Sequence, residues 1–313
     1  MNIIKNVRAR ARSWHGAVIG GALAWALSGL GGGSSTQIVN ASYKTPKVAS
    51  QSWYVSWANT NDAITRAEKI ACAEAERTET GVLFVGFGRQ IQGGASSFGI
   101  GLVSYARIQE FATAYARGLS ECSEGRWIVA VMTSNDHLDD PALAATYGKL
   151  WGQLAQDTNA SLDAPRVEIA AGIDVEPAWG PFAAAKAWAD NVHSTGARIV
   201  FGPSADGCPI DVDGPCNNGW NTAAMGDLMW GYGDRTIVMP QVYRLKMAQQ
   251  WANIERVARA RGKDEYVDAV LTQNRACRVT KQRPCLDLGP IKAQELASEV
   301  FGREMPLGSD ISW

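Results

Sequence analysis

Residues 170–180 read AAGIDVEPAWG. The small and branched apolar residues of 170–175 are typical of a buried strand, and Pro177 would end it. Asp174 and Glu176 interrupt this run two residues apart. Because residues two apart on a strand share a face, both carboxylates are predicted to point the same way at the carboxyl end of the strand.

Short apolar runs of this kind alternate with segments of helical period from residue 52 onward. The predicted strands cover 52–57, 82–88, 127–133, 166–176, 198–204, 236–243, 266–272 and 309–313, the last reading SDISW. The predicted helices cover 62–77, 106–119, 141–155, 181–193, 221–230, 247–261 and 290–301. This order predicts parallel strands joined by right-handed crossovers, and its length fits one closed (β/α)8 TIM barrel of about 250 residues.

An open doubly wound sheet is the alternative architecture. It would usually carry a glycine-rich phosphate loop after its first strand, and SWYVSWANTND at 52–62 has none. We therefore expect a single barrel domain over residues 52–313, preceded by an extension at 42–51.

The first 41 residues have the order of a secretory signal peptide. Four basic residues between positions 5 and 12 precede the apolar run Ala17–Leu30, which is shorter than the roughly 20 residues that span a bilayer. Val39-Asn40-Ala41 predicts cleavage after Ala41 and a secreted, extracellular protein. A retained membrane anchor, linked through the Gly/Ser stretch 31–35, is the alternative.

The charge balance argues against nucleic acid as a partner. Cleavage would remove four basic and no acidic residues, leaving 26 Lys and Arg against 31 Asp and Glu. Nucleic-acid binding calls for a concentrated basic surface. After cleavage, no stable membrane partner is expected.

Six cysteines remain in the predicted mature chain, and an even number in an exported protein is typical of disulfides. Cys208 and Cys216 have the same short spacing as Cys277 and Cys285, so each pair could close a local loop. That arrangement leaves Cys72 to pair with Cys122. Zinc is the alternative, but the chain has no C-x-x-C and few histidines, so we expect no metal.

The two carboxylates of 174–176 suit acid catalysis. In a TIM barrel, active sites lie at the carboxyl ends of the strands. Repulsion between neighbouring carboxylates can keep one of them protonated, which makes it a general acid. We assign Glu176 as the acid and Asp174 as the partner that tunes it. A structural role, holding a helix N-terminus, an arginine or a calcium ion, is the alternative.

Other predicted strand ends also carry polar or aromatic residues. Gln241 and Tyr243 share a face after the sixth strand. Further candidates for binding a saccharide are Ser204, Asp206, Gln273, Trp57, Trp179 and Trp313, together with Trp220, since tryptophans can stack on pyranose rings. The chain has no G-x-S-x-G nucleophile elbow and no nucleotide or flavin motif, so no cofactor is expected.

The motifs SWYVSWANTNDA, IDVEPAWG, FGPSADGCP, PQVYR and DISW, in this order, resemble a group of secreted, uncharacterised actinobacterial-type proteins regarded as glycoside-hydrolase-like barrels. The D-x-E of Asp174 and Glu176 more distantly resembles that of family 18 chitinases and family 25 lysozymes. That resemblance implies that Glu176 is the acid, that Tyr243 positions an N-acetyl group, that Trp313 forms the floor, and that the substrate's acetamido oxygen is the nucleophile.

The sequence departs from these families at three places. The chitinase pattern has another Asp where Gly172 stands, and its tyrosine is followed by Asp where this chain has Arg244. The lysozymes carry an Asp on the first strand, and SWYVSW has none. Three hypotheses follow: a secreted glycoside hydrolase acting on an N-acetylated polysaccharide such as peptidoglycan or chitin, a non-catalytic extracellular barrel that binds glycan or protein, or a structural surface protein whose carboxylates only hold the rim of the barrel together.

Overall fold

The computed structural model describes residues 48–96, 101–264, 266–279 and 285–313. The predicted signal peptide, residues 1–41, lies outside the described residues, as does most of the predicted extension. The first strand begins at Ser50, so the last two residues assigned to the extension belong to the barrel.

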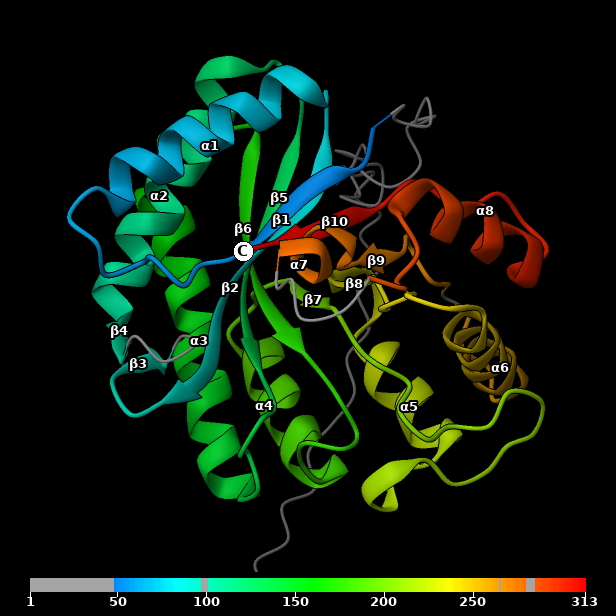
Figure 1. Cartoon of the computed structure of the whole chain (residues 1–313). Helices are drawn as coiled ribbons and strands as arrows, with labels where there is room; N and C mark the ends of the chain where they lie inside the picture. The colour runs from blue at the N-terminus through cyan, green and yellow to red at the C-terminus, as the bar shows by residue number, and fades with distance from the viewer. Residues whose placement is uncertain (1–47, 97–100, 265, 280–284) are drawn as a thin grey trace, which may run out of the picture. The chain divides into compact units, whose positions relative to one another are not determined.

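The strands and helices alternate along the chain (Figure 1). The strands are β1 (Ser50–Tyr54), β2 (Gly81–Ile91), β3 (Gly94–Ser96), β4 (Leu102–Ser104), β5 (Trp127–Ser134), β6 (Val167–Asp174), β7 (Ile199–Phe201), β8 (Thr236–Val238), β9 (Leu271–Thr272) and β10 (Ser309–Ser312). The helices are α1 (Ala63–Arg77), α2 (Tyr105–Cys122), α3 (Pro141–Ser161), α4 (Phe182–Ser194), α5 (Thr222–Met229), α6 (Leu245–Ala260), α7 (Asn274–Val279) and α8 (Pro290–Phe301). Two short 3-10 turns cover Asn217–Gly219 and Gly233–Arg235.

The strands form the predicted (β/α)8 barrel. Their order in the sheet is β8-β7-β6-β5-β2-β1-β10-β9, and each neighbouring pair in this order is parallel. Beyond β8, a parallel bridge joins Gln241 to Leu271 of β9, with the Leu271 N–H donating to the Pro240 carbonyl at 2.9 Å. This bridge links the two ends of the order, so the ring of strands closes.

The core has two layers, as a barrel requires. Side chains inside the ring of strands pack on one another; they are Phe84, Ile128, Ala130, Met132, Ala170, Val200, Ile237, Met239, Ala269, Leu271 and Ile311. The alternate residues of the same strands face outward and pack under the helices, as Ala171 and Ile173 of β6 do. Figure 1 shows α1 to α4 along one side of the strands and α5, α6 and α8 along the other.

Helix ends follow the local chemistry of the sequence. The Asp140 carboxylate accepts a hydrogen bond from the Ala142 N–H at 2.8 Å and caps α3, whose first residue is Pro141. The Ser104 hydroxyl accepts from the Arg107 N–H and caps α2 in the same way. Gly302 ends α8 in the left-handed conformation, with φ of 67°.

The structure contains a β3–β4 hairpin and helix α7, which the sequence analysis did not predict. The hairpin forms because β2 continues three residues beyond the predicted end at Gly88 and turns back through Gly93, whose φ is +85°. β7, β8 and β9 are shorter than predicted: they cover three, three and two residues. The strands of the hairpin and helix α7 are too short to show a clear period in the sequence.

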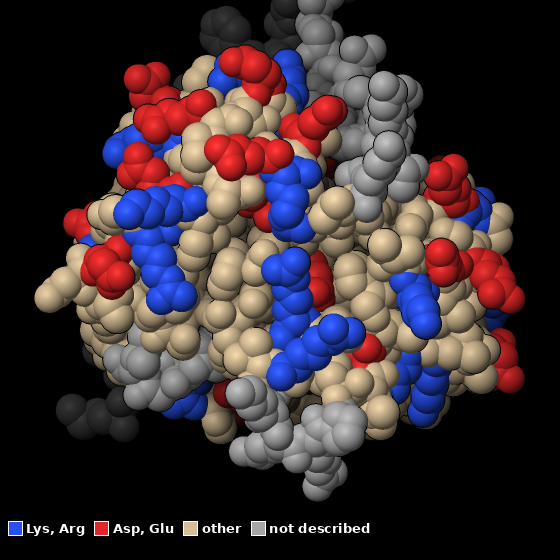
Figure 2. Space-filling model, turned by 45° about the horizontal axis from the view of Figure 1, so that its top comes forward, with Lys and Arg blue, Asp and Glu red and all other residues tan. Residues whose placement is uncertain are grey.

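The three predicted disulfides are confirmed. Cys72 pairs with Cys122 between α1 and α2, and two bonds, Cys208–Cys216 and Cys277–Cys285, close loops at the carboxyl ends of β7 and β9. Within the described ranges, no helix is both long enough and apolar enough to cross a bilayer. On the face that Figure 2 presents, basic and acidic groups are interspersed.

Asp268 lies where β8 and β9 meet, at the end of the barrel opposite the strands' carboxyl ends. Its carboxylate accepts a hydrogen bond from the Val238 N–H at 2.7 Å, and its own N–H donates to the Val238 carbonyl at 2.9 Å. Burial raises the pKa of Asp268 to about 7, although the Val238 N–H and the charges of Arg198 and Arg303 act to lower it. The fold therefore disfavours ionisation of this carboxyl.

Replacing Asp268 by Asn should stabilise the protein at alkaline pH. A raised pKa makes the folded state lose stability as pH climbs from about 4 through 7, and Asn does not ionise while its Oδ1 can still accept from Val238. Each unit of pKa corresponds to about 1.4 kcal/mol. Because Asp268 keeps partial contact with solvent, we discount the full shift and expect a gain of about 2 kcal/mol at pH 8 and almost none at pH 4. Urea unfolding at both pH values tests this, and an equal difference at the two would contradict it.

Candidate active site

The two carboxylates lie at the carboxyl end of β6, inside the ring. Along this strand Ala170 packs in the barrel interior, whereas Ala171, Ile173 and Val175 pack beneath the helices. The alternation turns Asp174 inward, where its side chain is only 6% exposed. Glu176 follows two residues later and is partly exposed to solvent. The predicted shared face is therefore the inner face of the barrel.

A cleft of about 610 Å³ opens above this end of the strands. Seven of the eleven residues predicted for the site line it: Asp174, Glu176, Trp179, Gln241, Tyr243, Gln273 and Trp313. The cleft is also lined by Tyr54, Gly86, Gly88, Arg89, Ser96, Met132, Thr133, Ser134 and Asp136. This volume is typical of a small-molecule site.

Gln241 fixes the position of Asp174. The Gln241 side-chain Nε2 donates to Asp174 Oδ1 at 2.7 Å and to the Gly202 carbonyl at 3.1 Å. Both hydrogens of this buried amide are thereby used. Gln241 therefore acts on Asp174, in addition to bordering the cleft where it was predicted to contact substrate.

Asn135 holds the backbone of Glu176. Its Nδ2 donates to the Glu176 carbonyl at 2.9 Å, and its Oδ1 accepts from the Glu176 N–H at 2.9 Å. Asn135 itself is 1% exposed. The sequence places Asn135 directly after the strand that neighbours β6, which is the one signal of this role, because residues after adjacent parallel strands lie at the same edge of the sheet.

The surroundings raise the pKa of both carboxyls. Burial raises the pKa of Asp174 well above its ordinary value, the charge of Glu176 raises it further, and the Gln241 amide opposes both. Burial also raises the pKa of Glu176 to about 7, helped by the charges of Asp206 and Asp136 and opposed by Gln241. Repulsion within the pair disfavours ionisation of both carboxyls at once, and the charges of Asp206 and Asp136, from two other loops, add to the burial that raises the pKa of Glu176.

Two phenols stand beside the carboxyl pair. Burial raises the pKa of Tyr54 well above 10, and the charges of Asp174 and Glu176 add to this. Burial does the same for Tyr243, with contributions from Tyr54 and both carboxyls. The two hydroxyls therefore keep their protons and can donate hydrogen bonds in the cleft. The Tyr54 ring lies 4.8 Å from that of Trp313, centroid to centroid, so the two form one aromatic wall.

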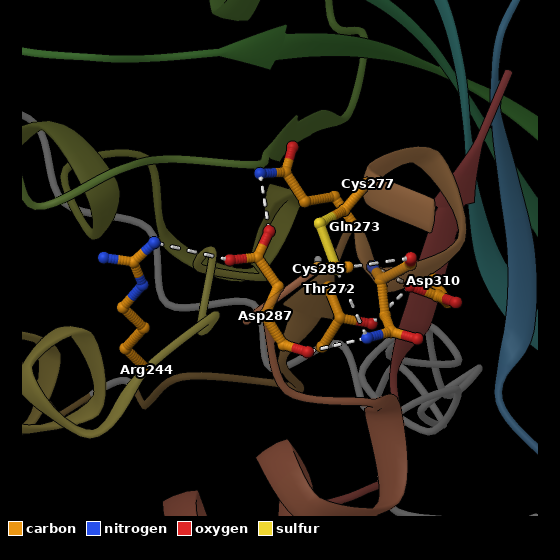
Figure 3. Close-up of a disulfide and its surroundings, with 8 residues drawn as sticks. Arg244, Thr272, Gln273, Cys277, Cys285, Asp287 and Asp310 are labelled. Atoms are coloured by element: carbon orange, nitrogen blue, oxygen red, sulfur yellow. Dashed lines mark hydrogen bonds and ion pairs between the residues drawn. A yellow bond between two sulfur atoms is a disulfide. The ribbon is translucent and has the colours of Figure 1, made fainter. Parts of the chain in front are cut away.

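The Cys277–Cys285 disulfide supports another wall of the cleft, which Figure 3 shows in close-up. Asp287, two residues after this disulfide, accepts from Gln273 Nε2 at 3.2 Å and lies 3.7 Å from the Arg244 guanidinium. The Leu288 N–H donates to the Tyr243 carbonyl at 3.0 Å. The segment after Cys285 therefore holds two residues that line the cleft.

The same region contains a group of potential metal ligands, Cys277, Cys285 and Asp287. Both sulfurs of this group are bonded to each other, so it offers a single carboxylate and no thiolate. In the described ranges, this group does not form a metal centre of the usual four-ligand kind.

Three predicted site residues do not line the cleft. Trp57 is 7% exposed and packs against Phe111 of α2, with the Arg66 guanidinium over its ring, so its stacking face is covered. Ser204 is buried, and its N–H donates to the Val175 carbonyl. Asp206 acts on the site through its charge on Glu176.

Trp220, considered with these residues, is also in the core. It is 1% exposed, and its indole N–H donates to the Gly180 carbonyl at 2.8 Å. That bond supports the turn that carries Trp179, which is 37% exposed at the edge of the cleft. Of these two tryptophans, only Trp179 is exposed at the cleft.

Comparisons with known proteins find resemblance in structure alone. No protein-family model matches the chain, and no curated protein matches it in sequence. A candidate α-L-fucosidase from Bacteroides thetaiotaomicron aligns over 86% of each chain with 8% identity and a TM-score of 0.48. A sugar phosphate isomerase/epimerase from Parabacteroides distasonis aligns over 85% of this chain and 89% of its own, with 11% identity and a TM-score of 0.41. A chitinase from Ipomoea carnea aligns over 84% and 93%, with 10% identity and a TM-score of 0.39.

Proposed function

We propose that this protein is a secreted glycoside hydrolase that acts on an N-acetylated polysaccharide of the peptidoglycan or chitin type. Glu176 is the general acid in this proposal. The observation that carries it is a partly exposed carboxyl with a pKa of about 7, next to a deeper carboxyl whose pKa is also raised, in a cleft of saccharide size. A general acid is most effective when its pKa lies near the working pH.

The other groups of the cleft suit a sugar chain. Trp179 and the wall formed by Tyr54 and Trp313 supply aromatic faces for stacking on pyranose rings. Tyr243 and Gln273 supply a hydroxyl and an amide for its polar substituents. A few convergent polar groups among aromatic surfaces are typical of ligand sites.

The proposed reaction needs no nucleophile from the protein. Glu176 donates its proton to the glycosidic oxygen as that bond breaks, and the acetamido oxygen of the sugar bonds to the anomeric carbon. Water then opens this ring, and Glu176 takes back a proton from the water. Asp174, held by Gln241 at 2.7 Å, stands beside Glu176 throughout as its partner.

Secretion is part of the proposal. Three disulfides and no free cysteine among the described residues support folding in an oxidising compartment. The basic and apolar N-terminal segment is the expected export signal.

A second candidate function is glycan binding without hydrolysis, and Gly172 favours it. A Cβ at this position would lie 3.1 Å from the Ala130 Cβ and 3.1 Å from the Met132 Cα. The interior therefore has little room for the additional Asp of the chitinase pattern. A barrel without that group could keep the cleft and lack turnover.

Reducing-end release separates the two functions. The secreted, oxidised protein is incubated with chitin oligosaccharides and with purified peptidoglycan, and new reducing ends are counted over time. Turnover on either material supports the hydrolase. Saturable binding without release from correctly folded protein contradicts the hydrolase and supports the binding function.

The pH profile of turnover should depend on Asp206 and Asp136. Since Glu176 must carry its proton, kcat/KM should fall as pH rises through about 7. Asp206→Asn and Asp136→Asn remove negative charges that disfavour ionisation of Glu176, so the pKa of Glu176 should drop. We expect the alkaline limb of the profile to move to lower pH by about half a unit in the double variant.

The control for this measurement is Asp157→Asn, because Asp157 is exposed on α3, where its carboxylate accepts a hydrogen bond from the Gln153 side chain on the same helix at 2.8 Å. Its alkaline limb should coincide with that of the wild type. If the alkaline limb of the double variant stays at the wild-type pH or moves to higher pH, Asp206 and Asp136 do not raise the pKa of Glu176.

A further inference from the structure

Arg89 enters the cleft because of an irregularity in β2. Glycine stands at positions 86 and 88, both of which line the cleft, and regular alternation would turn residue 89 outward. The pairing of β2 with β5 shifts between Gly86 and Arg89, and Gly88 has φ of +80°. Such bulges bend a strand and redirect the following side chain, and their positive φ favours glycine. Arg89 therefore lines the cleft directly after Gly88.

The bulge is held in place by β5. The Thr133 hydroxyl donates to the Gly88 carbonyl at 3.0 Å, and Thr133 is 2% exposed. Register with β5 resumes at Arg89, which pairs with Ser134. The direction of Arg89 is thus set by the backbone of two paired strands, since both sides of the bulge are hydrogen-bonded.

Two serines flank Arg89 within the cleft. Ser134 is its neighbour on β5, and Ser96 is its neighbour on β3, across the antiparallel pair. Both serines line the same cavity. In the described ranges, no ion pair or hydrogen bond engages the Arg89 guanidinium, whereas Arg198 and Arg303 each bind a carboxylate. An arginine and two hydroxyls therefore face the cleft with donors to spare.

We propose that Arg89, Ser96 and Ser134 form a subsite for a carboxylate carried by the glycan. The planar guanidinium matches a carboxylate in a two-pronged hydrogen bond, and the serine hydroxyls add donors beside it. Of the described residues that line the cleft, the other acidic or basic ones are Asp136, Asp174 and Glu176, and a carboxyl offers no positive charge to an anion. Arg89 is thus the group of the cleft that attracts an acidic substituent.

This inference rests on the proposed function and narrows its substrate. Peptidoglycan strands and chitin share the same N-acetylated sugar backbone. Peptidoglycan strands differ from chitin because alternate sugars carry an ether-linked carboxylate. The subsite predicts a preference for the strand that carries the free carboxylate over the neutral polymer.

The test compares two probes of equal size. One is a peptide-free tetrasaccharide of alternating N-acetylglucosamine and N-acetylmuramic acid with free carboxylates; the other is the same tetrasaccharide with each carboxylate converted to its N-methylamide. Binding is measured by calorimetry in the Glu176→Gln background, so that hydrolysis does not interfere. Arg89→Gln and Arg89→Lys are compared with Arg117→Gln, an exposed arginine on α2.

We expect the acid probe to bind at least about tenfold more tightly than the amide, and Arg89→Gln to remove that preference. Arg89→Lys should restore part of it, and high salt should reduce it. Arg117→Gln should leave the affinity for both probes unchanged. Equal affinity of the parent protein for both probes, or an equal loss for both in Arg89→Gln, would overturn the subsite.

The subsite can be tested even if the protein has no hydrolase activity. The preference is measured as binding, whereas the proposed function is tested by reducing-end release from the wild type. Turnover without an acid preference would overturn the subsite alone. An acid preference without turnover would support the subsite and reject the hydrolase.

Discussion

Glu176→Gln is expected to lower glycan turnover about a thousandfold, since a positioned general acid contributes roughly 10²- to 10⁴-fold. Gln keeps the size of the side chain and its place at the edge of the cleft but has no proton to donate to the leaving oxygen. The fold should be unharmed, because Asn135 holds residue 176 through backbone groups that the substitution leaves in place. Reducing-end release, with thermal unfolding measured beside it, provides the test.

Glu168→Gln is the matched control. Glu168 lies on the same strand, near its opposite end, and pairs with Arg198 at 2.9 Å outside the cleft. The same chemical change there should leave turnover within about twofold of the wild type, because a surface ion pair contributes roughly 1 kcal/mol or less to stability. Full activity of Glu176→Gln, or equal losses in both variants, would refute the assignment of Glu176 as the acid.

The second large effect is expected in stability, from removal of the Cys72–Cys122 disulfide. This bond joins α1 to α2 across 50 residues of sequence. The two helices approach closely, since a Cβ on Gly118 would lie 2.3 Å from the Glu68 carbonyl oxygen. Loop-closure entropy predicts a loss of about 4 kcal/mol in the free energy of unfolding for the double Cys→Ala variant.

The Cys208–Cys216 bond provides the comparison, because its loop spans only 8 residues. The same argument gives about 2.5 kcal/mol for that double variant. Urea unfolding under oxidising conditions measures both, with the slope m reporting any change in the unfolded state. Equal losses in the two variants, or a greater loss for the short loop, would contradict the entropic explanation.

Much of the fold could be predicted from periodicity. The alternation of apolar runs and helical segments indicated the barrel, and helix α8 has the predicted bounds, because Pro290 and Gly302 mark its ends. The hairpin β3–β4 was missed, since its three-residue strands show no period and form through turning glycines. The disulfides could be paired because two of them close local loops.

The candidate site could be predicted in part. Spacing along single strands placed Asp174 with Glu176 and Gln241 with Tyr243, since residues two apart share a face. Spacing did not distinguish tryptophans of the core from tryptophans of the cleft. Trp57 is buried under α2 and Trp179 borders the cleft, although both follow a strand. Which face of a loop residue is covered depends on helices far away in the sequence.

The sequence by itself determined the alternation of the barrel strands with their helices and the shared face of the carboxyl pair, and it favoured the pairing of the cysteines, because each depends on spacing along the chain. Only the tertiary structure decided which groups surround Glu176. Asp206 and Asp136 act on it from two other loops, Asn135 holds its backbone, and the Gly88 bulge turns Arg89 into the cleft. These relations depend on distances across the barrel, which closure of the ring of strands sets.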